Sequence, residues 1–271
     1  MDWGNRETDL QFIDNYRPTA DGQQQFRILL HGPIGAGKSS FINSVTSVLT
    51  GKISVRADAA SSQTSHTKKY TTYSIEKGDQ GQMYPFVLND MSGLESADRR
   101  VRRVHVKDVK KAMKGCIKDG YIFNPQSSLS KDDRFYNKKP NVNDKVHIVV
   151  TVIDAQTASI IPDNTVEIIQ EIRDEAADLG IPHMVIFAKT DKACPEIKKD
   201  LAKMFCSRIL HEQIQKFSKL VGFPENCIFP IKNYHSETTL KNDIDALLLK
   251  TLRRIIEIAE EQLKNKNRTQ T

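Results

Sequence analysis

The sequence predicts an α/β domain with a mostly parallel, six-stranded sheet and helices on both of its faces. Short apolar runs alternate along the chain with longer segments in which apolar residues recur every three or four positions. Strands that alternate with helices form parallel sheets, because each connection crosses back over a face of the sheet. Ligands of such sheets bind at the carboxyl ends of the strands, and the polar motifs of this chain directly follow apolar runs.

The expected strands are either continuously apolar or alternate apolar and polar residues. They span residues 26–30, 69–76, 85–90, 145–155, 182–188 and 227–231. The expected helices place apolar residues on one face, as Ile244, Leu248 and Leu252 do near the C-terminus. They span residues 38–49, 104–114, 165–179, 196–220 and 244–263. Gly180 and Gly222 follow two of these segments and act as helix stops.

Length and composition indicate one globular domain with an insertion. The chain has 271 residues, of which 38% are hydrophobic and 27% charged. We expect residues 1–24 to form an N-terminal arm, residues 25–264 the domain, and residues 265–271 a disordered tail. Residues 115–144 are rich in Gly, Pro, Asn, Ser and Asp and form an insertion. A segment that long usually has a function or structure of its own, so we expect a mobile lid or a surface for self-association or for another protein, the alternative being a plain loop packed on the domain by its aromatic residues.

Charge, cysteine pattern and hydropathy exclude several classes of protein. The net charge of +6 is a modest surplus without a basic stripe interleaved with aromatic residues, so nucleic acid is not an expected partner. The four cysteines include no CxxC pair, which argues against a zinc or redox motif and fits a reducing compartment. No apolar run is long enough to cross a bilayer, and the polar start is not a signal peptide, so we expect a cytoplasmic protein.

The segment GPIGAGKS at residues 32–39 matches the phosphate-binding pattern GxxxxGK[ST]. Its glycines permit a tight turn that points successive amides at phosphate oxygens, and the following helix adds its positive end. Lys38 is expected to reach the outer phosphates and assist catalysis, Ser39 to bind magnesium, and Ser40 to help at the inner phosphate. The loop residues expected to hold the phosphates are Gly32, Ile34, Gly35, Ala36 and Gly37.

A carboxylate for the metal follows the strand at residues 85–90. Asp90-Met91-Ser92-Gly93 fits the DxxG pattern of nucleotide switches. Asp90 is expected to hold magnesium, and the amide of Gly93 to contact the γ-phosphate and so sense its loss.

A threonine from the preceding loop is expected to complete the magnesium shell in the triphosphate state. Thr64 and Thr67 both lie in that loop. Thr67 is preferred as metal ligand and catalytic residue because it comes just before the strand at residues 69–76.

The base is indicated by the segment that follows the strand at residues 182–188. Ala188-Lys189-Thr190-Asp191 is similar to the [NT]KxD motif. Asp191 would accept hydrogen bonds from the guanine N1–H and 2-amino group, which adenine cannot reproduce, and the stem of Lys189 would lie over the base. Ala188 stands where Asn or Thr is usual, which removes a side-chain hydrogen bond to the phosphate loop. After the last strand, a backbone amide of Asn233 or Lys232 is expected to contact guanine O6.

Together, the segments FRILLHGPIGAGKSSFINSV, KKYTTYSI, PFVLNDMSGL and IKNYHSE resemble the interferon-induced protein 44 and 44-like family. The resemblance runs from about residue 10 to about residue 262. It implies a P-loop NTPase G domain that binds GTP or GDP with magnesium, together with interferon induction, a cytoplasmic location and roles in antiviral defence and growth control. Members of that family often carry an extra N-terminal domain, whereas this sequence matches the GTP-binding domain alone.

Three functions remain open at this point. The chain is a GTP-binding switch with slow hydrolysis, an ATPase or small-molecule kinase, or an interaction scaffold whose nucleotide is structural or absent. The pair Lys189 and Asp191 favours the first function, and Ala188 keeps the third one open. Slow turnover is expected because Leu94 stands where many GTPases have a water-orienting glutamine. The downstream cluster at residues 99–103 holds four arginines, of which one would act as an arginine finger in cis or across a dimer, unless the cluster is only a solvated helix face.

Overall fold

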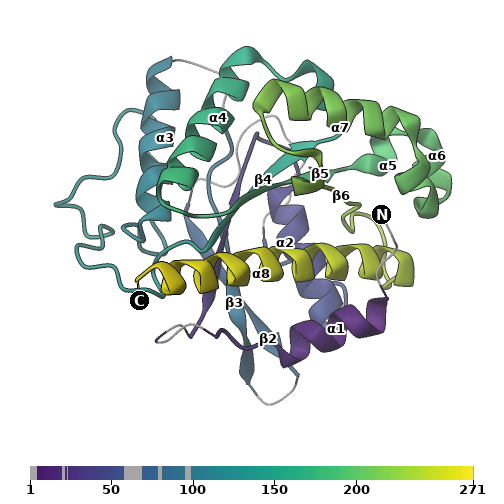
Figure 1. Ribbon diagram of the computed structural model, residues 1–271, viewed down its shortest axis with the longest axis horizontal. Helices are drawn as coiled ribbons and strands as arrows, with labels where there is room; N and C mark the ends of the chain where they lie inside the picture. Colours follow the sequence, from purple (N-terminus) through teal and green to yellow (C-terminus); the bar gives the residue numbers. More distant parts are fainter. Residues whose placement is uncertain are drawn as a thin grey trace.

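A six-stranded sheet forms the centre of the molecule (Figure 1). The computed structural model describes residues 5–19, 22, 24–57, 69–78, 81–94 and 99–270, with side chains as far as residue 265. The strands are β1 (Phe26–His31), β2 (Thr71–Lys77), β3 (Gln82–Asp90), β4 (Ile148–Asp154), β5 (His183–Ala188) and β6 (Ile228–Pro230). Their order is β2-β3-β1-β4-β5-β6, and β2 is antiparallel to β3 while all other neighbours are parallel. The predicted α/β architecture is confirmed.

Helices cover both faces of this sheet. They are α1 (Arg6–Asn15), α2 (Lys38–Thr50), α3 (Arg99–Met113), α4 (Asp163–Asp178), α5 (Thr190–Ala193), α6 (Pro195–Lys199), α7 (Arg208–Val221) and α8 (Asn242–Gln270). Three short 3-10 segments are η1 (Ala158–Ile160), η2 (Leu201–Cys206) and η3 (Glu225–Cys227). Helices α1, α2 and α8 pack together on one side of the sheet, and α3, α4 and α7 on the other (Figure 1).

The central strands are buried on both faces, which explains their composition. In β4, the side chains of Val149, Val150 and Val152 are fully buried. A strand covered by helices on both sides has no solvent face, so it is a continuous run of β-branched residues rather than an alternating one. Because β3, β1, β4 and β5 are parallel neighbours, their carboxyl ends lie together at one edge of the sheet, and the motifs follow them there.

The segment between β5 and α7 differs from the prediction. We expect one helix over residues 196–220, but the chain forms α6, η2 and α7 in succession. Asp200 and Ser207 interrupt it because both have extended backbone and act as N-caps. The Asp200 carboxylate accepts from Ala202 N at 3.0 Å, and the Ser207 hydroxyl accepts from Leu210 N at 3.3 Å.

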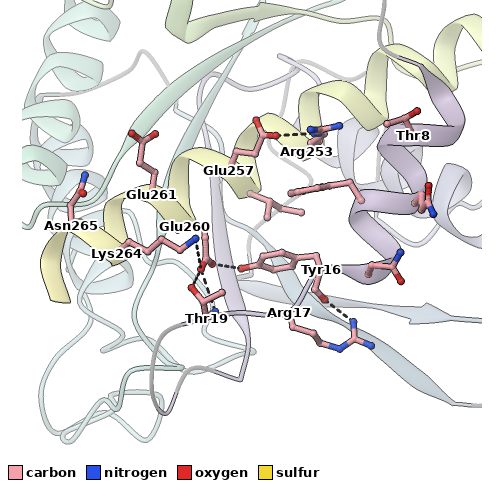
Figure 2. A pocket seen from close by; sticks show the side chains of 14 residues that line it. Thr8, Tyr16, Arg17, Thr19, Arg253, Glu257, Glu260, Glu261, Lys264 and Asn265 are labelled. Atoms are coloured by element: carbon pink, nitrogen blue, oxygen red, sulfur yellow. Dashed lines mark hydrogen bonds and ion pairs between the residues drawn. The ribbon is translucent and has the colours of Figure 1, made fainter. Parts of the chain in front are cut away.

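The N-terminal segment contains a helix that is docked on the C-terminal one. In α1, the Asn5 side chain caps the first turn, and Ile13 is fully buried. Figure 2 shows Tyr16 just beyond α1 donating to Glu260 of α8 at 2.7 Å. Glu260 also accepts hydrogen bonds from the amide and hydroxyl of Thr19. Residues 1–24, expected to be an arm, thus include an element packed on the domain.

Helices α1 and α8 border a groove of about 810 Å³ (Figure 2). Its lining residues come from the two helices and the short segment after α1, and none belongs to residues 32–39. Helix α8 continues to Gln270, through most of the segment 265–271 in which we expect a disordered tail. Among the described residues, no helix combines the length and the apolar content that a membrane span requires.

The insertion at residues 115–144 is folded onto α3 and β2 without a regular helix or strand of its own. Tyr121 is buried and donates to Asp108 of α3 at 3.0 Å. The second oxygen of Asp108 accepts from Leu129 N at 2.9 Å. Near β2, the amide of Tyr70 donates to the carbonyl of Tyr121 at 2.7 Å. A buried carboxylate and a few backbone bonds therefore take the place of secondary structure in this segment.

Candidate functional site

The phosphate loop joins β1 to α2 and needs glycine at three positions. Gly32, Gly35 and Gly37 have φ angles of 134°, 71° and 110°, in the left-handed region that side chains disfavour. A Cβ atom on Gly32 would also overlap the carbonyl oxygen of Val152 in β4. The loop residues expected to hold phosphates, Gly32, Ile34, Gly35, Ala36 and Gly37, are therefore parts of one tight turn against the neighbouring strand.

Lys38 is the first residue of α2, and its side chain folds back over the loop. Its ammonium donates to the carbonyls of Gly32 and Pro33, each at 3.0 Å. The residue is 6% exposed, and burial lowers the pKa of Lys38 to about 8, against the opposing effect of the Asp90 carboxylate. Burial disfavours the charged form of this lysine, because it removes water from the ammonium group. A bound polyanion would stabilise the charged form by interacting with it in place of water.

A hydroxyl and a carboxylate meet beside this lysine. The Ser39 hydroxyl donates to Asp90 at 2.8 Å, and Asp90 is 1% exposed. Asp90 reaches this point because β3 lies parallel to β1, with Leu30 opposite Asp90. Oxygen ligands of this type are the ones that Mg²⁺ prefers. Ser40 follows Ser39 in the same helical turn, and its carbonyl accepts from Ser44 Oγ at 2.7 Å.

The DxxG segment lies directly on the phosphate loop. A Cβ atom on Gly93 would approach the Cα atom of Ile34 to 2.9 Å, so only glycine fits. Backbone bonds join the two loops, from Ile34 N to Leu94 O at 3.3 Å and from Leu94 N to Gly32 O at 3.1 Å. Thr64 and Thr67 lie outside the described residues.

The segment expected to hold the base follows β5. Lys189 has φ 59° and ψ 34°, and it is the non-glycine residue with positive φ in the described part of the chain. Its ammonium lies 2.8 Å from the Asp154 carboxylate at the end of β4. Asp191 is partly buried in α5. The strand end itself lies against the phosphate loop, because the Cβ atom of Ala188 is 3.2 Å from the position that a Cβ atom on Gly37 would take.

The loop after β6 closes the other side of this segment. Asn233 is 8% exposed, and its amide group donates to the carbonyl of Gly37 at 3.2 Å. The buried Thr190 hydroxyl donates to Ile231 O at 2.9 Å, and Tyr234 N donates to Ser44 Oγ at 2.9 Å. Lys232, the alternative to Asn233 in the sequence prediction, forms an ion pair with Glu237 at 2.6 Å.

Sequence reasoning missed several residues around this edge of the sheet. Asp154 ends an apolar strand as Asp90 does, which is a signal that the prediction did not use. His31, the last residue of β1, is fully buried, and its ring lies 5.6 Å from that of His105 in α3. Burial, followed by the neighbouring His105, holds the pKa of His31 well below its usual range. No sequence pattern marks this pair, because it depends on how α3 packs on the sheet.

Comparison with known proteins identifies the family. A family model described as 50S ribosome-binding GTPase matches residues 27–189, from β1 to the base segment. The chain belongs to this GTPase family. The match includes the phosphate loop, the DxxG segment and Lys189, so the P-loop NTPase G domain predicted from these motifs is confirmed.

Curated relatives support the resemblance seen in the sequence. The chain is 33% identical over 260 residues to interferon-induced protein 44 of Homo sapiens, which covers 96% of this chain and 58% of that protein. It is 30% identical over 253 residues to interferon-induced protein 44-like of Homo sapiens, covering 93% of this chain and 56% of that protein. The chain thus spans less than two thirds of the length of these relatives.

A solved structure shows the same fold at low identity. Toc33 of Arabidopsis thaliana superposes with a TM-score of 0.52 at 12% identity, over 97% of this chain and 98% of that one. The two chains therefore share a fold over nearly their whole lengths.

Proposed function

We propose that this chain binds GTP and GDP with magnesium and acts as a nucleotide switch that hydrolyses GTP slowly. The observation that carries the proposal is the meeting of three elements at one edge of the sheet. These are the glycine-rich loop with Lys38, the pair of Ser39 and Asp90, and the loop that holds Lys189 and Asp191.

Each element would do one part of the binding. The loop amides and Lys38 hold the phosphates, where the start of α2 adds its positive end. Ser39 and Asp90 hold the magnesium ion, directly or through water, and the ion neutralises phosphate charge. In the described part of the chain, no three His, Cys, Asp or Glu side chains are grouped to hold a metal by themselves.

Guanine selectivity would come from Asp191. A carboxylate accepts hydrogen bonds and does not donate them, so it pairs with the N1–H and 2-amino group of guanine and not with adenine. The ion pair between Lys189 and Asp154 fixes the lysine stem at the end of β4 and β5, where it would cover one face of the base.

Slow hydrolysis is supported by Leu94. The residue after the DxxG segment is 5% exposed and packs in the core, and its backbone is bonded to the phosphate loop. It has no group that orients a water molecule, in contrast to the glutamine of many GTPases. A switch whose two states are set by the bound nucleotide does not require fast GTP hydrolysis.

The cellular role is also a proposal. Because the curated relatives are interferon-induced proteins, we propose that the chain belongs to a cytoplasmic, interferon-induced antiviral response. Transcript and protein levels before and after interferon treatment test this part. Unchanged levels in cells that respond to interferon by other markers would contradict it.

Calorimetric titration with GTP, GDP and ATP in magnesium tests the nucleotide. We expect GTP and GDP to bind and ATP to bind at least tenfold more weakly, because losing both guanine contacts to Asp191 costs about 1.5–3 kcal/mol. Lys38→Ala should abolish binding, and Asp191→Asn should weaken guanine nucleotides while leaving the fold intact. The matched controls are Lys107→Ala and Asp178→Asn, which change exposed residues outside the site. Equal affinity of the unmodified protein for ATP and GTP overturns the guanine assignment.

A further inference from the structure

The base segment lacks the side chain that would tie it to the phosphate loop. Ala188 ends β5 and is fully buried. Its Cβ atom lies 3.2 Å from the position that a Cβ atom on Gly37 would take. The two loops therefore touch at this point, but a methyl group can form no hydrogen bond between them.

A different residue reaches the same point from the neighbouring strand. Strand β6 pairs with β5, with Pro230 opposite Phe187, and Asn233 follows β6 by three residues. The Asn233 amide nitrogen also lies 3.2 Å from the Cβ position of Gly37. It donates to the Gly37 carbonyl at 3.2 Å, across 196 residues of sequence.

The bond has a defined direction. The Gly37 carbonyl also accepts from Phe41 N at 2.9 Å, which is the first helical bond of α2. A carbonyl oxygen has two lone pairs, so it can accept both hydrogen bonds, and it has no hydrogen to donate. The Asn233 side chain must therefore turn its NH₂ group toward Gly37 and its oxygen away from it.

We propose that Asn233 supplies, from the loop after β6, the inter-loop hydrogen bond that Ala188 cannot make. It is a positioning residue that holds the base loop against the phosphate loop, so that Lys38 and Asp191 are set at a fixed separation. The proposal rests on the proposed nucleotide function and names a determinant of affinity at the same site.

The surroundings of Asn233 fit this role. On one side Thr190 Oγ1 is bonded to Ile231 O, and on the other Tyr234 N is bonded to Ser44 Oγ of α2. The loop after β6 is thus fixed both to the base segment and to the helix that carries the phosphate loop. Asn233 stands between the two anchors, and the Gly37 bond completes a closed ring of contacts.

The oxygen of the Asn233 side chain adds a second argument. It is buried and accepts no hydrogen bond within the described residues. An unsatisfied buried acceptor costs stability, so it is retained where a ligand or an ordered water supplies the donor. An apolar packing role would not require an amide at this position.

Three variants at positions 188 and 233 test the proposal. The Kd of each is measured for GDP and GTP in magnesium. Asn233→Ala should raise the Kd about tenfold, because one buried hydrogen bond is lost and the loops separate. Asn233→Asp has the same shape but places a carboxylate oxygen against the Gly37 carbonyl, so it should weaken binding more than alanine does. Asn233→Ala combined with Ala188→Asn should recover affinity to within about threefold of the unmodified protein, since the bond is restored from β5.

The control is Asn137→Ala, which removes another partly buried amide, bonded to Gly115 O and Asp144 in the insertion. It should lower thermal stability without changing Kd. Rescue by the double variant would not follow from a merely structural role of Asn233. If Asn233→Ala does not fold, the double variant still decides, since a folded, nucleotide-binding double variant supports the proposal and an unfolded one overturns it.

Two outcomes overturn the inference. One is a Kd of the folded Asn233→Ala or Asn233→Asp variant equal to that of the unmodified protein. The other is a double variant no better than Asn233→Ala. If the unmodified protein binds neither GTP nor GDP, the proposed function itself fails, which is distinguishable because the first titration shows it before any variant is compared.

Discussion

The hydroxyl of Ser39 and the carboxylate of Asp90 are joined by a 2.8 Å hydrogen bond. One residue lies in the first turn of α2 and the other is the last residue of β3, so the bond links a helix to a strand two elements later. The pairing of β3 with β1 places them together, because Asp90 lies opposite Leu30 just before the phosphate loop. The hydroxyl and the carboxylate that we propose as magnesium ligands are thus brought together by the pairing of two strands.

The first prediction concerns this pair. Asp90→Asn should lower the affinity for GTP at least tenfold in magnesium and leave the weak binding in EDTA unchanged, because an amide is a poorer Mg²⁺ ligand than a carboxylate. Titration of both proteins in magnesium and in EDTA measures this difference. Asp178→Asn is the control, since Asp178 is exposed at the end of α4. An Asp90→Asn variant that gains as much from magnesium as the unmodified protein does would contradict the metal assignment.

The second prediction concerns Leu94. Its side chain is 5% exposed and its backbone is bonded to Gly32 and Ile34, so a glutamine placed there has its amide buried in the core. Leu94→Gln should therefore cost about 1–3 kcal/mol of unfolding free energy and should not accelerate hydrolysis. The unmodified protein should turn over on the order of 10⁻³ s⁻¹ or more slowly, as a GTPase without an arginine finger does.

Single-turnover hydrolysis and urea denaturation check these expectations. Leu94→Met is the matched control, because it keeps an apolar side chain of similar volume. Faster hydrolysis by Leu94→Gln would show that residue 94 can turn toward the phosphate. A rate per molecule that stays the same over a wide range of protein concentration would exclude an arginine supplied by a second copy of the chain.

The fold could be predicted from the sequence where the signal is local. Apolar runs gave all six strands to within a few residues, and the phosphate loop and DxxG segment each follow a strand, as their chemistry requires. The error at residues 196–220 has a local cause as well. Asp200 and Ser207 are ordinary helix N-caps, which the apolar periodicity around them does not reveal.

The rest depends on contacts between distant residues. Asn233 and Gly37 are 196 residues apart, and only the pairing of β5 with β6 brings them together. Helix α1 is largely polar, and most of its contacts are with α8, which lies more than 200 residues away in the sequence. The insertion is held to α3 by the hydrogen bond between Tyr121 and Asp108. The sequence around either residue does not indicate that the two side chains meet.

The third prediction concerns the contact between the two terminal helices. Tyr16 is 8% exposed and donates to Glu260 at 2.7 Å (Figure 2). Tyr16→Phe keeps the ring but leaves the carboxylate without this donor, so it should cost about 1.5–3 kcal/mol of unfolding free energy. Urea denaturation measures the loss. Nucleotide affinity should stay unchanged, because the groove between α1 and α8 shares no lining residue with the phosphate loop. A Tyr16→Phe variant as stable as the unmodified protein would show that the bond contributes nothing.

The fourth prediction concerns acid stability and rests on His105 and His183, which are partly exposed but each bury one ring nitrogen. Burial, and then the charge of Lys38, lower the pKa of His105 to about 4, while burial and then Arg173 lower the pKa of His183 to about 3. In the unfolded chain, histidine titrates near pH 6.5. Above that pH both histidines are neutral in the folded and in the unfolded chain, so they make no pH-dependent contribution to stability there. As the pH falls from about 6.5 toward 4, the unfolded chain takes up protons that the folded chain refuses, and stability is lost.

Between pH 7 and pH 5 the loss should be on the order of 2 kcal/mol for each histidine, in addition to any loss from other groups. Urea denaturation at the two pH values measures it. His105→Leu should reduce the difference between the two unfolding free energies, because it removes one of the protons that the unfolded chain takes up. His211→Leu is the control, since His211 is exposed on α7, and it should leave the difference as it is in the unmodified protein. If His105→Leu keeps the whole difference, the acid sensitivity comes from other groups and not from the histidine that packs beside His31.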